Sequence, residues 1–396
     1  MTIIEALSKV VDTIKKWCES RYIKYEDGNL LADYKTPQDY GAGGKGLTDD
    51  TAAINQAIAE NDIIYFPNGT YNISSPILVE AQGKKIYGAK NAKIILKNCD
   101  GIVIKNPNNL ELSDLQIIGD KSEHHGIVID GGGYKCHFKN LSVRELAGDG
   151  FHTNWYIGGF GVCTIEKCKF HYCRNGIWCL SDAVDQRNNI TIANNQIYGT
   201  EQSAVRATGC AIIVENNNIE ACQYAVRVDN WEEVPDDRPE VHYCGTTAVR
   251  ITGNYIEGAT EAVFSFASSY EGNPETGYKM DGRLDGVIIE SNLVFNSTKT
   301  NQVEEFAWVK FISYAMYDII SGSGDNIKVD KVYLIGDVSF AGNVFNTDRW
   351  PLSPIVNGNN LLTKTCRFNI SRVSRGSCIN MGEAVIVRDT DNYEDT

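Results

Sequence analysis

The chain has 396 residues, 42% of them hydrophobic, so it is long enough for one large domain or two medium ones with a substantial core. Its formal net charge of −14 argues against nucleic acid as the main partner, because phosphate binding needs a basic surface. No stretch of roughly 18 consecutive apolar residues occurs, so no membrane-spanning helix and no membrane insertion are expected.

Residues 1–33 are predicted to form an N-terminal helix and a linker. Apolar residues recur there at steps of four and three, as in a short a/d seam: Ile3, Leu7, Val10, Ile14 and Trp17. Such a helix suits oligomerisation or docking to another protein, and the alternative is a helix that covers one end of the domain. The segment lacks a small-residue cleavage site, so it is not expected to be a signal peptide.

Residues 39–58 read DYGAGGKGLTDDTAAINQAI, a glycine-rich turn followed by a helical pattern. Thr48 is the expected N-cap, with Asp49 and Asp50 in the first turn. One apolar stripe of the helix comprises Ala53, Ile54, Ala57 and Ile58. This pattern favours a helix that caps an apolar core. Phosphate binding by the glycine-rich turn is the alternative, although the Lys-Ser pair of a phosphate loop is missing.

The following residues, IIYFPNGTYNI at 63–73, read as strand, turn and strand. Together the two motifs resemble the opening segment of the pectate-lyase-like superfamily, which typically contains Asp-Phe-Gly-Ala, Asp-Asp-Thr and Phe-Pro-x-Gly-x-Tyr. This segment is frequent in phage tailspikes and related polysaccharide enzymes. The resemblance implies an all-β protein, a right-handed parallel β-helix with a capping helix at its N-terminal end. It specifies a fold and not a reaction.

Later segments repeat one pattern, an alternating apolar strand followed by Asn, any residue and an apolar residue. The aligned asparagines are Asn195, Asn217, Asn254, Asn292 and Asn343. Weaker copies lie near Asp114, Asn140 and Cys168. One coil cannot bury its apolar face alone, so stacked coils are expected to bury it together. The asparagines are expected to satisfy backbone groups at a bend and to bond one another from coil to coil.

The spacing of the repeats defines the predicted organisation. A β-helix is expected over residues 34–346, followed by a β-rich C-terminal cap over residues 347–396. Long steps between repeats are expected to be insertions on the scaffold, at 229–245, 268–283 and 297–326.

Stacking predicts which outward side chains become neighbours. The strands that follow each bend should place one column on the surface: Val128, His152, Trp178, Arg206, Arg227 and Phe264. A parallel row should contain Asp130, Asn154, Leu180, Thr208, Asp229 and Phe266. Aromatic and arginine side chains in line suit sugar faces and sugar carboxylates, so His152, Trp178, Arg206, Arg227 and Trp231 are candidate substrate-binding residues. An ordinary solvated β face is the alternative.

A second row is expected three residues after each aligned bend position: His171, Tyr198, Glu220, Glu257 and Phe295. Glu220 and Glu257 would lie about 4.8 Å apart at the backbone. Glycosidases need two carboxyl groups about 5–9.5 Å apart, so this pair is the first catalytic candidate. Asp229 and Glu232 are further catalytic candidates, and Tyr198 extends the row as a substrate-binding residue. Exposed glutamates splayed into water are the alternative.

Twelve cysteines occur without any Cys-x-x-Cys pair. The densest group is Cys163, Cys168, Cys173 and Cys179, with His171 among them. Reduced, buried thiols are the expected state, and a metal site in this group stays open as the alternative. No metal and no cofactor are predicted. A calcium-dependent lyase site around Asp229 with Arg206 or Arg227 as the base is a further alternative.

The resemblance and the columns together predict a tailspike-like protein that binds bacterial surface polysaccharide and cleaves it, with hydrolysis favoured over lyase chemistry. The resemblance implies a homotrimer in a phage virion, synthesised in the bacterial host cytoplasm. Residues 1–33 would then contact other tail proteins. A non-catalytic adhesin and a structural virion component remain alternatives.

Overall fold

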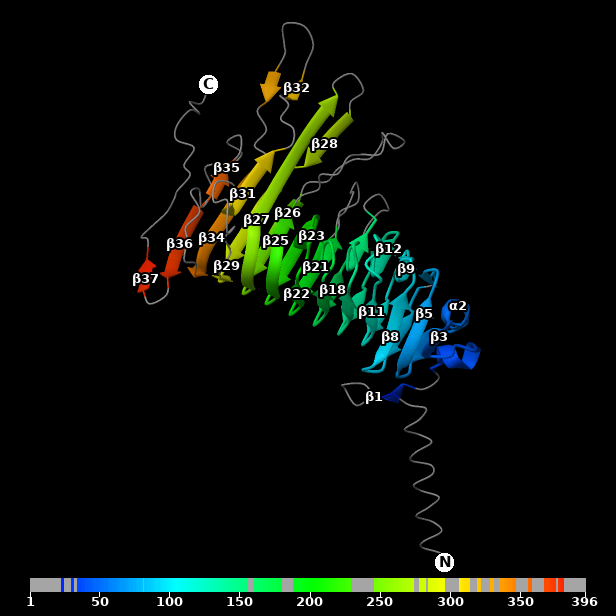
Figure 1. Cartoon of the computed structure of the whole chain (residues 1–396). Helices are drawn as coiled ribbons and strands as arrows, with labels where there is room; N and C mark the ends of the chain where they lie inside the picture. The colour runs from blue at the N-terminus through cyan, green and yellow to red at the C-terminus, as the bar shows by residue number, and fades with distance from the viewer. Residues whose placement is uncertain are drawn as a thin grey trace, which may run out of the picture.

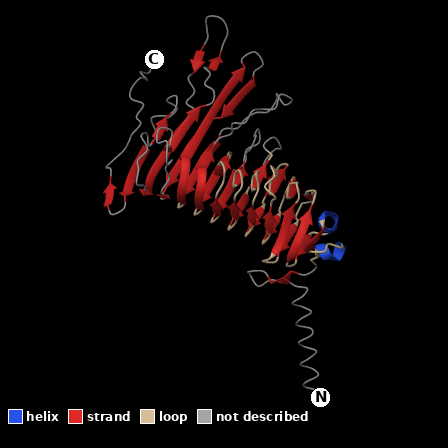
Figure 2. Ribbon diagram, viewed as in Figure 1, coloured by secondary structure: helices blue, strands red, loops and turns tan. Residues whose placement is uncertain are grey.

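The computed structural model describes most of the chain from residue 34 to residue 313 and shorter segments on either side. The described residues are 23–24, 30–31, 34–80, 82–154, 160–179, 188–228, 246–273, 278–282, 284–295, 306–313, 319–321, 328–330, 335–346, 355–357, 367–374 and 377–380. Short strands stack side by side along one axis, with the helical elements at the N-terminal end of the stack (Figure 1). Strands and short loops alternate along the whole stack (Figure 2).

Parallel pairing arranges the strands in three stacks, which we call faces A, B and C. Face A comprises β4 (Ile63–Phe66), β7 (Lys85–Gly88), β10 (Glu111–Ser113), β14 (His137–Lys139), β18 (Cys163–Glu166), β21 (Asn188–Ala193), β24 (Cys210–Glu215), β26 (Thr246–Thr252), β29 (Leu284–Glu290) and the first part of β34 (Ile335–Asn346).

Face B follows face A in every coil. It comprises β3 (Lys45–Asp49), β5 (Gly69–Ile73), β8 (Ala92–Leu96), β11 (Gln116–Ile118), β15 (Ser142–Arg144), β19 (Lys169–His171), β22 (Gln196–Tyr198), the first parts of β25 (Asn218–Val228) and β27 (Tyr255–Asn273), β30 (Leu293–Phe295) and the end of β34.

Face C completes each coil. It comprises β6 (Ile77–Val79), β9 (Ile102–Lys105), β12 (Ile127–Asp130), β16 (Phe151–Thr153), β20 (Ile177–Cys179), β23 (Ser203–Ala207), the later parts of β25 and β27, β31 (Ala307–Ser313) and β35 (Ile355–Asn357). The predicted parallel β-helix is therefore confirmed.

Further strand pairs lie outside the three faces. Antiparallel partners join β27 to β28 (Tyr278–Gly282), β32 (Ile319–Ser321) to β33 (Lys328–Asp330), and β1 (Ile23–Lys24) to β2 (Leu30–Leu31). The strands β13 (Gly133–Tyr134) and β17 (Phe160–Gly161) pair in parallel beside the main stack.

Alternation of inward and outward side chains builds the core. On face A one inward row runs in register through Leu112, Phe138, Ile165, Ile192, Val214, Ile251, Ile289 and Phe340. All of these side chains are buried, because each apolar residue on a strand sits above its counterpart on the next coil.

The asparagine ladder, defined as Asn195, Asn217, Asn254, Asn292 and Asn343, is confirmed in atomic detail. The Oδ1 atom of each member after the first accepts hydrogen bonds of 2.8–3.0 Å from both the backbone N–H and the side-chain amide of the preceding member. Each side-chain amide also donates to a backbone carbonyl of the preceding coil, such as Asn195 Nδ2 to the oxygen of Ile165. The ladder satisfies buried polar groups at the bend between faces A and B.

Two of the three weaker copies were aligned wrongly by one residue. Gln196 N–H donates to the oxygen of Cys168, and the same bond is made by Lys169 to Leu141 and by Ser142 to Leu115. The rung positions before Asn195 are therefore Leu115, Leu141 and Cys168. Asp114 and Asn140 instead occupy the preceding left-handed position, with φ of 60° and 53°. Asp and Asn adopt the left-handed conformation more readily than most residues. This preference explains why they recur next to the rung and were aligned with it.

The predicted capping helix is confirmed as α2 (Thr51–Glu60), but its N-cap was predicted wrongly. The N-cap is Asp50 and not Thr48, because the helix begins only at Thr51. Asp50 accepts hydrogen bonds from the backbone N–H groups of Gly43 and Gly44 at 2.7 and 3.3 Å. The Asp50 carboxylate therefore accepts from the N–H groups of the glycine-rich turn that a phosphate would need. The 3-10 helix η1 (Pro37–Tyr40) precedes this turn and contacts α2.

The sequence predicted a helix at the N-terminal end of the chain and an end to the coils at residue 346. The predicted helix over residues 3–17 lies outside the described residues. Parallel pairing continues past residue 346, since β34 pairs with β36 (Arg367–Ser374), which then turns back onto β37 (Ser377–Asn380). Stacking thus extends beyond the boundary that the sequence suggested. Among the described residues, no helix is long and apolar enough to cross a membrane.

Candidate functional site

The predicted column on face C is present in register for its first five members, beginning with Val128 beside His152. His152 pairs in register with Trp178, Trp178 with Arg206, and Arg206 with Arg227. The guanidinium of Arg206 lies 4.0 Å from the centre of the Trp178 ring, a cation–π contact. Trp178 and Arg206 are each only 5% exposed, so this part of the column is not an open solvated surface.

The last member of the column differs from the prediction. A register shift between Cys222 and Tyr224 moves the next rung by one residue, so Arg227 pairs with Ser265 rather than with Phe264. Phe264 and Phe266 therefore pair with Val226 and Val228 and are fully buried in the core. In the neighbouring row, Asn154 Nδ2 donates to Asp130 Oδ1 at 3.0 Å, as the expected adjacency requires.

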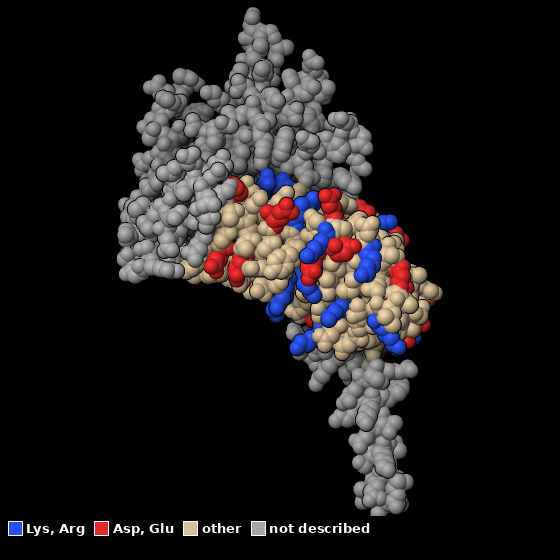
Figure 3. All heavy atoms as spheres, in the orientation of Figure 1, with Lys and Arg blue, Asp and Glu red and all other residues tan. Residues whose placement is uncertain are grey.

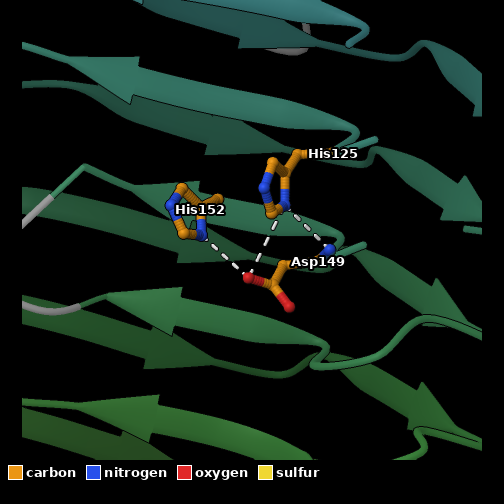
Figure 4. A group of neighbouring side chains, drawn as sticks. All are labelled: His125, Asp149 and His152. Carbon is orange, nitrogen blue, oxygen red and sulfur yellow. Dashed lines mark hydrogen bonds and ion pairs between the residues drawn. The ribbon is translucent and has the colours of Figure 1, made fainter. Parts of the chain in front are cut away.

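A buried carboxylate, which the sequence reasoning missed, lies at the start of this column. Asp149 is completely buried. Arg174 binds it with Nε at 3.0 Å from Oδ1 and Nη2 at 3.1 Å from Oδ2. Asn175 donates to Oδ1 from its backbone and its side chain, at 3.2 and 2.9 Å. Nδ1 of His152 lies 2.8 Å from Oδ2 (Figure 4). One guanidinium, the backbone and side-chain amides of Asn175 and an imidazole thus surround one buried anion.

A second imidazole stacks on the first. The rings of His125 and His152 lie 4.1 Å apart at an angle of 20°. The backbone N–H of Asp149 donates to His125 Nδ1 at 2.9 Å. The second ring nitrogen of each histidine is turned away from Asp149 in Figure 4. His125 and His152 side chains are 19% and 16% exposed, so each ring reaches the surface at one edge.

These residues belong to a second polar ladder at the corner that precedes face C. This corner ladder comprises Asp100, His125, Asp149, Asn175 and Ser203. The backbone N–H of each member donates to the side chain of the preceding one, at 2.7 Å for His125 to Asp100 and 2.9 Å for Ser203 to Asn175. The arrangement explains why acceptor side chains recur there.

Glycines allow the coils to approach at this corner. A Cβ added to Gly148 would lie 2.2 Å from the carbonyl oxygen of His124, and one added to Gly150 would lie 2.5 Å from the Phe170 ring. The Gly-Asp-Gly sequence around Asp149 is therefore required by packing between coils.

Electrostatics in the group favour a charged aspartate and a neutral His125. Burial acts to raise the pKa of Asp149, but hydrogen bonds from His152 and Arg174 outweigh it and hold this pKa well below its ordinary value. Burial lowers the pKa of His125 from 6.5 to about 4, and the adjacent His152 acts in the same direction. The carboxylates of Asp149 and Asp100 oppose this decrease without cancelling it.

Among the residues that the structure describes, His125, Asp149 and His152 are the one group whose ligand atoms lie close enough together, within 4.8 Å, to hold a metal ion. Their atoms are already engaged, however. Both oxygens of Asp149 accept from Arg174, and Nδ1 of His125 accepts a backbone N–H. The Arg174 cation beside the carboxylate also repels a metal ion. The arrangement is a hydrogen-bonded network.

The predicted row on face B is present in register. It runs through His171, Tyr198, Glu220, Glu257 and Phe295. Glu220 and Glu257 are half-buried neighbours on adjacent coils. The hydroxyl of Tyr255 donates to Glu257 at 2.7 Å, and this bond raises the pKa of Tyr255 to about 12. Asp229, Trp231 and Glu232, the other candidates, lie outside the described residues.

Aromatic side chains border this row. Tyr172 and Tyr198 meet edge to face at 5.4 Å and are 57% and 36% exposed. His171 meets Tyr198 at 6.1 Å. The pKa of His171 is lowered by burial and then by Lys169 and Arg144. This pairing of exposed rings with carboxylates is compatible with the sugar-binding role predicted for Tyr198.

The eight cysteines whose side chains the structure describes are free thiols, and all but Cys210 are buried. Cys168 and Cys173 direct their sulfur atoms at backbone carbonyls. Burial raises the pKa of Cys168 to about 12, so its thiol stays protonated at neutral pH. These properties fit the expected reduced thiols that act as small core residues.

A weak sequence signal marks the missed site. Four consecutive face C strands are preceded by a polar residue and a glycine, at Asp100–Gly101, His125–Gly126, Asp149–Gly150 and Asn175–Gly176. Aligning that position, in addition to the strands, would have placed Asp149 beside His125. Charged side chains of both signs are otherwise interspersed on the visible surface of the described residues (Figure 3).

Comparison with known families agrees with this geometry. Residues 36–101 match the family model described as rhamnogalacturonase A/epimerase, pectate lyase-like, and residues 100–294 match the right-handed β-helix region. Among solved structures, the tailspike protein of Acinetobacter baumannii phage AM24 is similar with a TM-score of 0.52 at 15% identity, covering 90% of this chain and 57% of that chain. An identity this low shows a shared fold only.

Curated relatives are similar over part of the chain. Mannuronan C5-epimerase AlgE5 of Azotobacter vinelandii is 22% identical over 254 residues, covering 50% of this chain and 24% of the relative. Alginate lyase 7 of the same organism is 27% identical over 199 residues, covering 46% and 22%. The chain spans less than a quarter of the length of these relatives. Taken with the three-faced solenoid, the family matches show a right-handed parallel β-helix whose residues 36–101 are similar to the pectate-lyase-like family.

Proposed function

We propose that this protein binds a polysaccharide across the outside of the solenoid and cleaves it by proton abstraction at His152. The observation that carries the proposal is the 2.8 Å contact between Nδ1 of His152 and the fully buried carboxylate of Asp149. A carboxylate held in this way orients the ring and leaves Nε2 as the basic atom at the surface. Trp178 and Arg206 continue the same column on the next two coils.

The chemistry suited to such a base is β-elimination next to a sugar carboxylate. His152 Nε2 takes the proton from the carbon beside the carboxylate, and the electron pair of that C–H bond forms a C=C bond. The adjacent C–O glycosidic bond breaks, and the leaving oxygen takes a proton from the imidazolium, which restores neutral His152. A uronic-acid polymer is therefore the substrate class that we propose, and the guanidinium groups of the column suit its charge.

The comparisons support a polysaccharide substrate. Relatives whose names denote a mannuronan epimerase and an alginate lyase are similar to half of this chain or slightly less. Neither covers enough of its own length to transfer an activity, so the argument for His152 depends on the geometry of the site.

A second candidate is hydrolysis at Glu220 and Glu257. The observation that favours it is their register pairing on adjacent coils, with Tyr255 bonded to Glu257. Two carboxyl groups on neighbouring coils fit the general acid and base, or nucleophile, of a glycosidase. Tyr172 and Tyr198 would then supply a stacking surface for the sugar.

We also propose that the protein acts on a phage tail as a homotrimer, made in the host cytoplasm and attached to other tail proteins through residues 1–33. The similarity in fold to a tailspike supports this setting. Gel filtration with light scattering measures the oligomer, and a variant lacking residues 1–33 tests attachment through particle assembly.

The deciding experiment is a turnover assay on purified acidic capsular or O-antigen polysaccharide. A lyase generates a C=C bond that absorbs in the ultraviolet together with new reducing ends, whereas a hydrolase generates reducing ends alone. His152→Gln should abolish the ultraviolet product and Glu220→Gln should not. Binding without either product identifies an adhesin and contradicts the proposed cleavage.

A further inference from the structure

The stacked imidazoles at the corner ladder differ in where each carries its proton. We propose that His125 and His152 are held in opposite tautomers, so that the site presents the Nε2–H donor of His125 beside the Nε2 lone pair of His152. The assignment of tautomers follows from hydrogen bonds alone, and the role of His125 toward a substrate depends on the function proposed above.

The assignment for His125 starts from a proton whose position is fixed covalently. The backbone N–H of Asp149 points at Nδ1 of His125 across 2.9 Å. A protonated Nδ1 would place two hydrogens face to face, so this nitrogen must carry the lone pair. Oδ2 of Asp149 lies 3.6 Å from the same nitrogen, beyond a good hydrogen bond. A neutral His125 therefore carries its proton on Nε2.

The rest of the corner ladder supports this assignment. Asp100 precedes His125, Asp149 and Asn175 follow it, and each offers an oxygen to the backbone N–H of the next coil. His125 occupies a position at which every described neighbour is an acceptor. Its Nδ1 takes the place that a carboxylate or amide oxygen takes on the other coils.

The assignment for His152 follows from its different partner. Nδ1 of His152 faces Oδ2 of Asp149 at 2.8 Å, and a carboxylate that is also bound by Arg174 only accepts. His152 must therefore donate from Nδ1, which leaves its lone pair on Nε2. The second nitrogens of both rings are turned away from Asp149 (Figure 4).

The consequence is a base and an electrophile side by side. Neutral imidazole is too weak an acid to give up its proton to a leaving group, but its N–H polarises an oxygen by hydrogen bonding. His125 would donate to the sugar carboxylate whose charge grows as His152 removes the adjacent proton. The rings of His125 and His152 stack with their centres 4.1 Å apart, so both can contact the same sugar unit.

The groups around His125 keep its imidazole neutral at neutral pH. Asp149, Asp100, His152 and Arg174 face its ring. Burial, His152 and Arg174 lower its pKa to about 4, and the carboxylates do not restore it. The Nε2–H donor is therefore available at neutral pH without a competing imidazolium.

Neutron diffraction from perdeuterated crystals of the full chain at pH 7.5 tests the tautomers directly. Deuterium is expected on Nε2 and not Nδ1 of His125, and on Nδ1 and not Nε2 of His152. Deuterium on Nδ1 of His125, or the same tautomer in both rings, overturns the proposal. This result does not depend on whether any polysaccharide is cleaved, so it separates the proposal from the proposed function.

Kinetics test the role of His125. His125→Asn keeps an acceptor for Asp149 N–H, because Asn Oδ1 and His Nδ1 lie equally far along the side chain, but it removes the donor. We expect kcat on the cleaved polymer to fall by about 10²–10³-fold with little change in KM. His124→Asn, on the neighbouring residue, is the matched control and should stay within about twofold. Wild-type kcat in a folded His125→Asn variant contradicts the donor role.

Discussion

Nδ1 of His152 and Oδ2 of Asp149 lie 2.8 Å apart within one coil of the solenoid. Asp149 lies in the corner of its coil. His152 lies three residues later, on the strand that follows. The carboxylate also receives Arg174 and Asn175 from the next coil. A buried charge with this many partners is fixed in position before any substrate arrives.

Asp149→Asn should therefore impair both stability and catalysis. The amide cannot accept every bond that the carboxylate accepts, and Arg174 loses its counter-charge. We expect the free energy of unfolding to fall by about 2–3 kcal/mol and cleavage to fall by at least about 10³-fold. Urea denaturation and the turnover assay measure the two effects. Asp130→Asn, a half-buried carboxylate on the same face, is the control and should change stability by less than about 1 kcal/mol.

The pH dependence of stability should contain a contribution from His125. Its pKa is about 4 in the folded chain and 6.5 ordinarily, so between these values the unfolded chain binds more protons. Stability should rise as pH increases from 4 to 6.5 and gain nothing from this residue above that. His125→Asn should remove this part of the slope, on the order of 2 kcal/mol. Denaturation midpoints across the pH range provide the test, and an unchanged slope in the variant contradicts it.

Asn254→Leu should strongly destabilise the solenoid. Leucine is accepted at the same rung position in Leu115 and Leu141. In mid-ladder it would leave two donors of Asn217 without their acceptor and would remove one donor from Oδ1 of Asn292. Two buried donors lose their partner, so we expect a loss of about 2–5 kcal/mol. Thermal and chemical unfolding measure it. Lys169→Ala, at an exposed position on face B, should stay within about 0.5 kcal/mol.

Glu220→Gln and Glu257→Gln decide between the two proposed reactions. Lyase chemistry at His152 should survive both changes within about threefold, because neither side chain belongs to the corner ladder. Hydrolysis by the glutamate pair should instead lose about 10²–10⁴-fold with either change. The assay is reducing-end release from the same polymer, with circular dichroism to confirm folding. Tyr255→Phe reports whether the bond to Glu257 matters to the second reaction.

Chelators should leave the His125–Asp149–His152 group intact. Its atoms are engaged in hydrogen bonds, and Arg174 supplies the positive charge that a metal would supply. Dialysis against EDTA should change neither the melting temperature nor turnover. Added zinc should raise the melting temperature by less than about 1 °C at concentrations that saturate ordinary zinc sites. A larger rise, abolished in His152→Gln, would establish a metal site in place of the network.

Much of the fold could be predicted because the pattern is local and repeated. The asparagines at 195, 217 and 254 each follow a strand that alternates in the same phase, so stacking them needs no knowledge of distant contacts. The same logic placed Glu220 beside Glu257 and His152 beside Trp178. It failed where β27 has one extra residue, between Ala259 and Ala262 opposite Cys222 and Tyr224, since a single bulge turns Phe264 from the surface to the core.

The sequence by itself determined the repeat, the inward and outward phase of most strands, and the capping helix, because each depends on side chains close together in the chain. Only the tertiary structure decided that His125, Asp149 and Arg174 meet. The polar residue at these corners differs in type from coil to coil, and the offset between coils depends on turns of unequal length. Which atom of a polar side chain donates or accepts is settled by the neighbouring coil, a few ångströms away in space and more than twenty residues away in sequence.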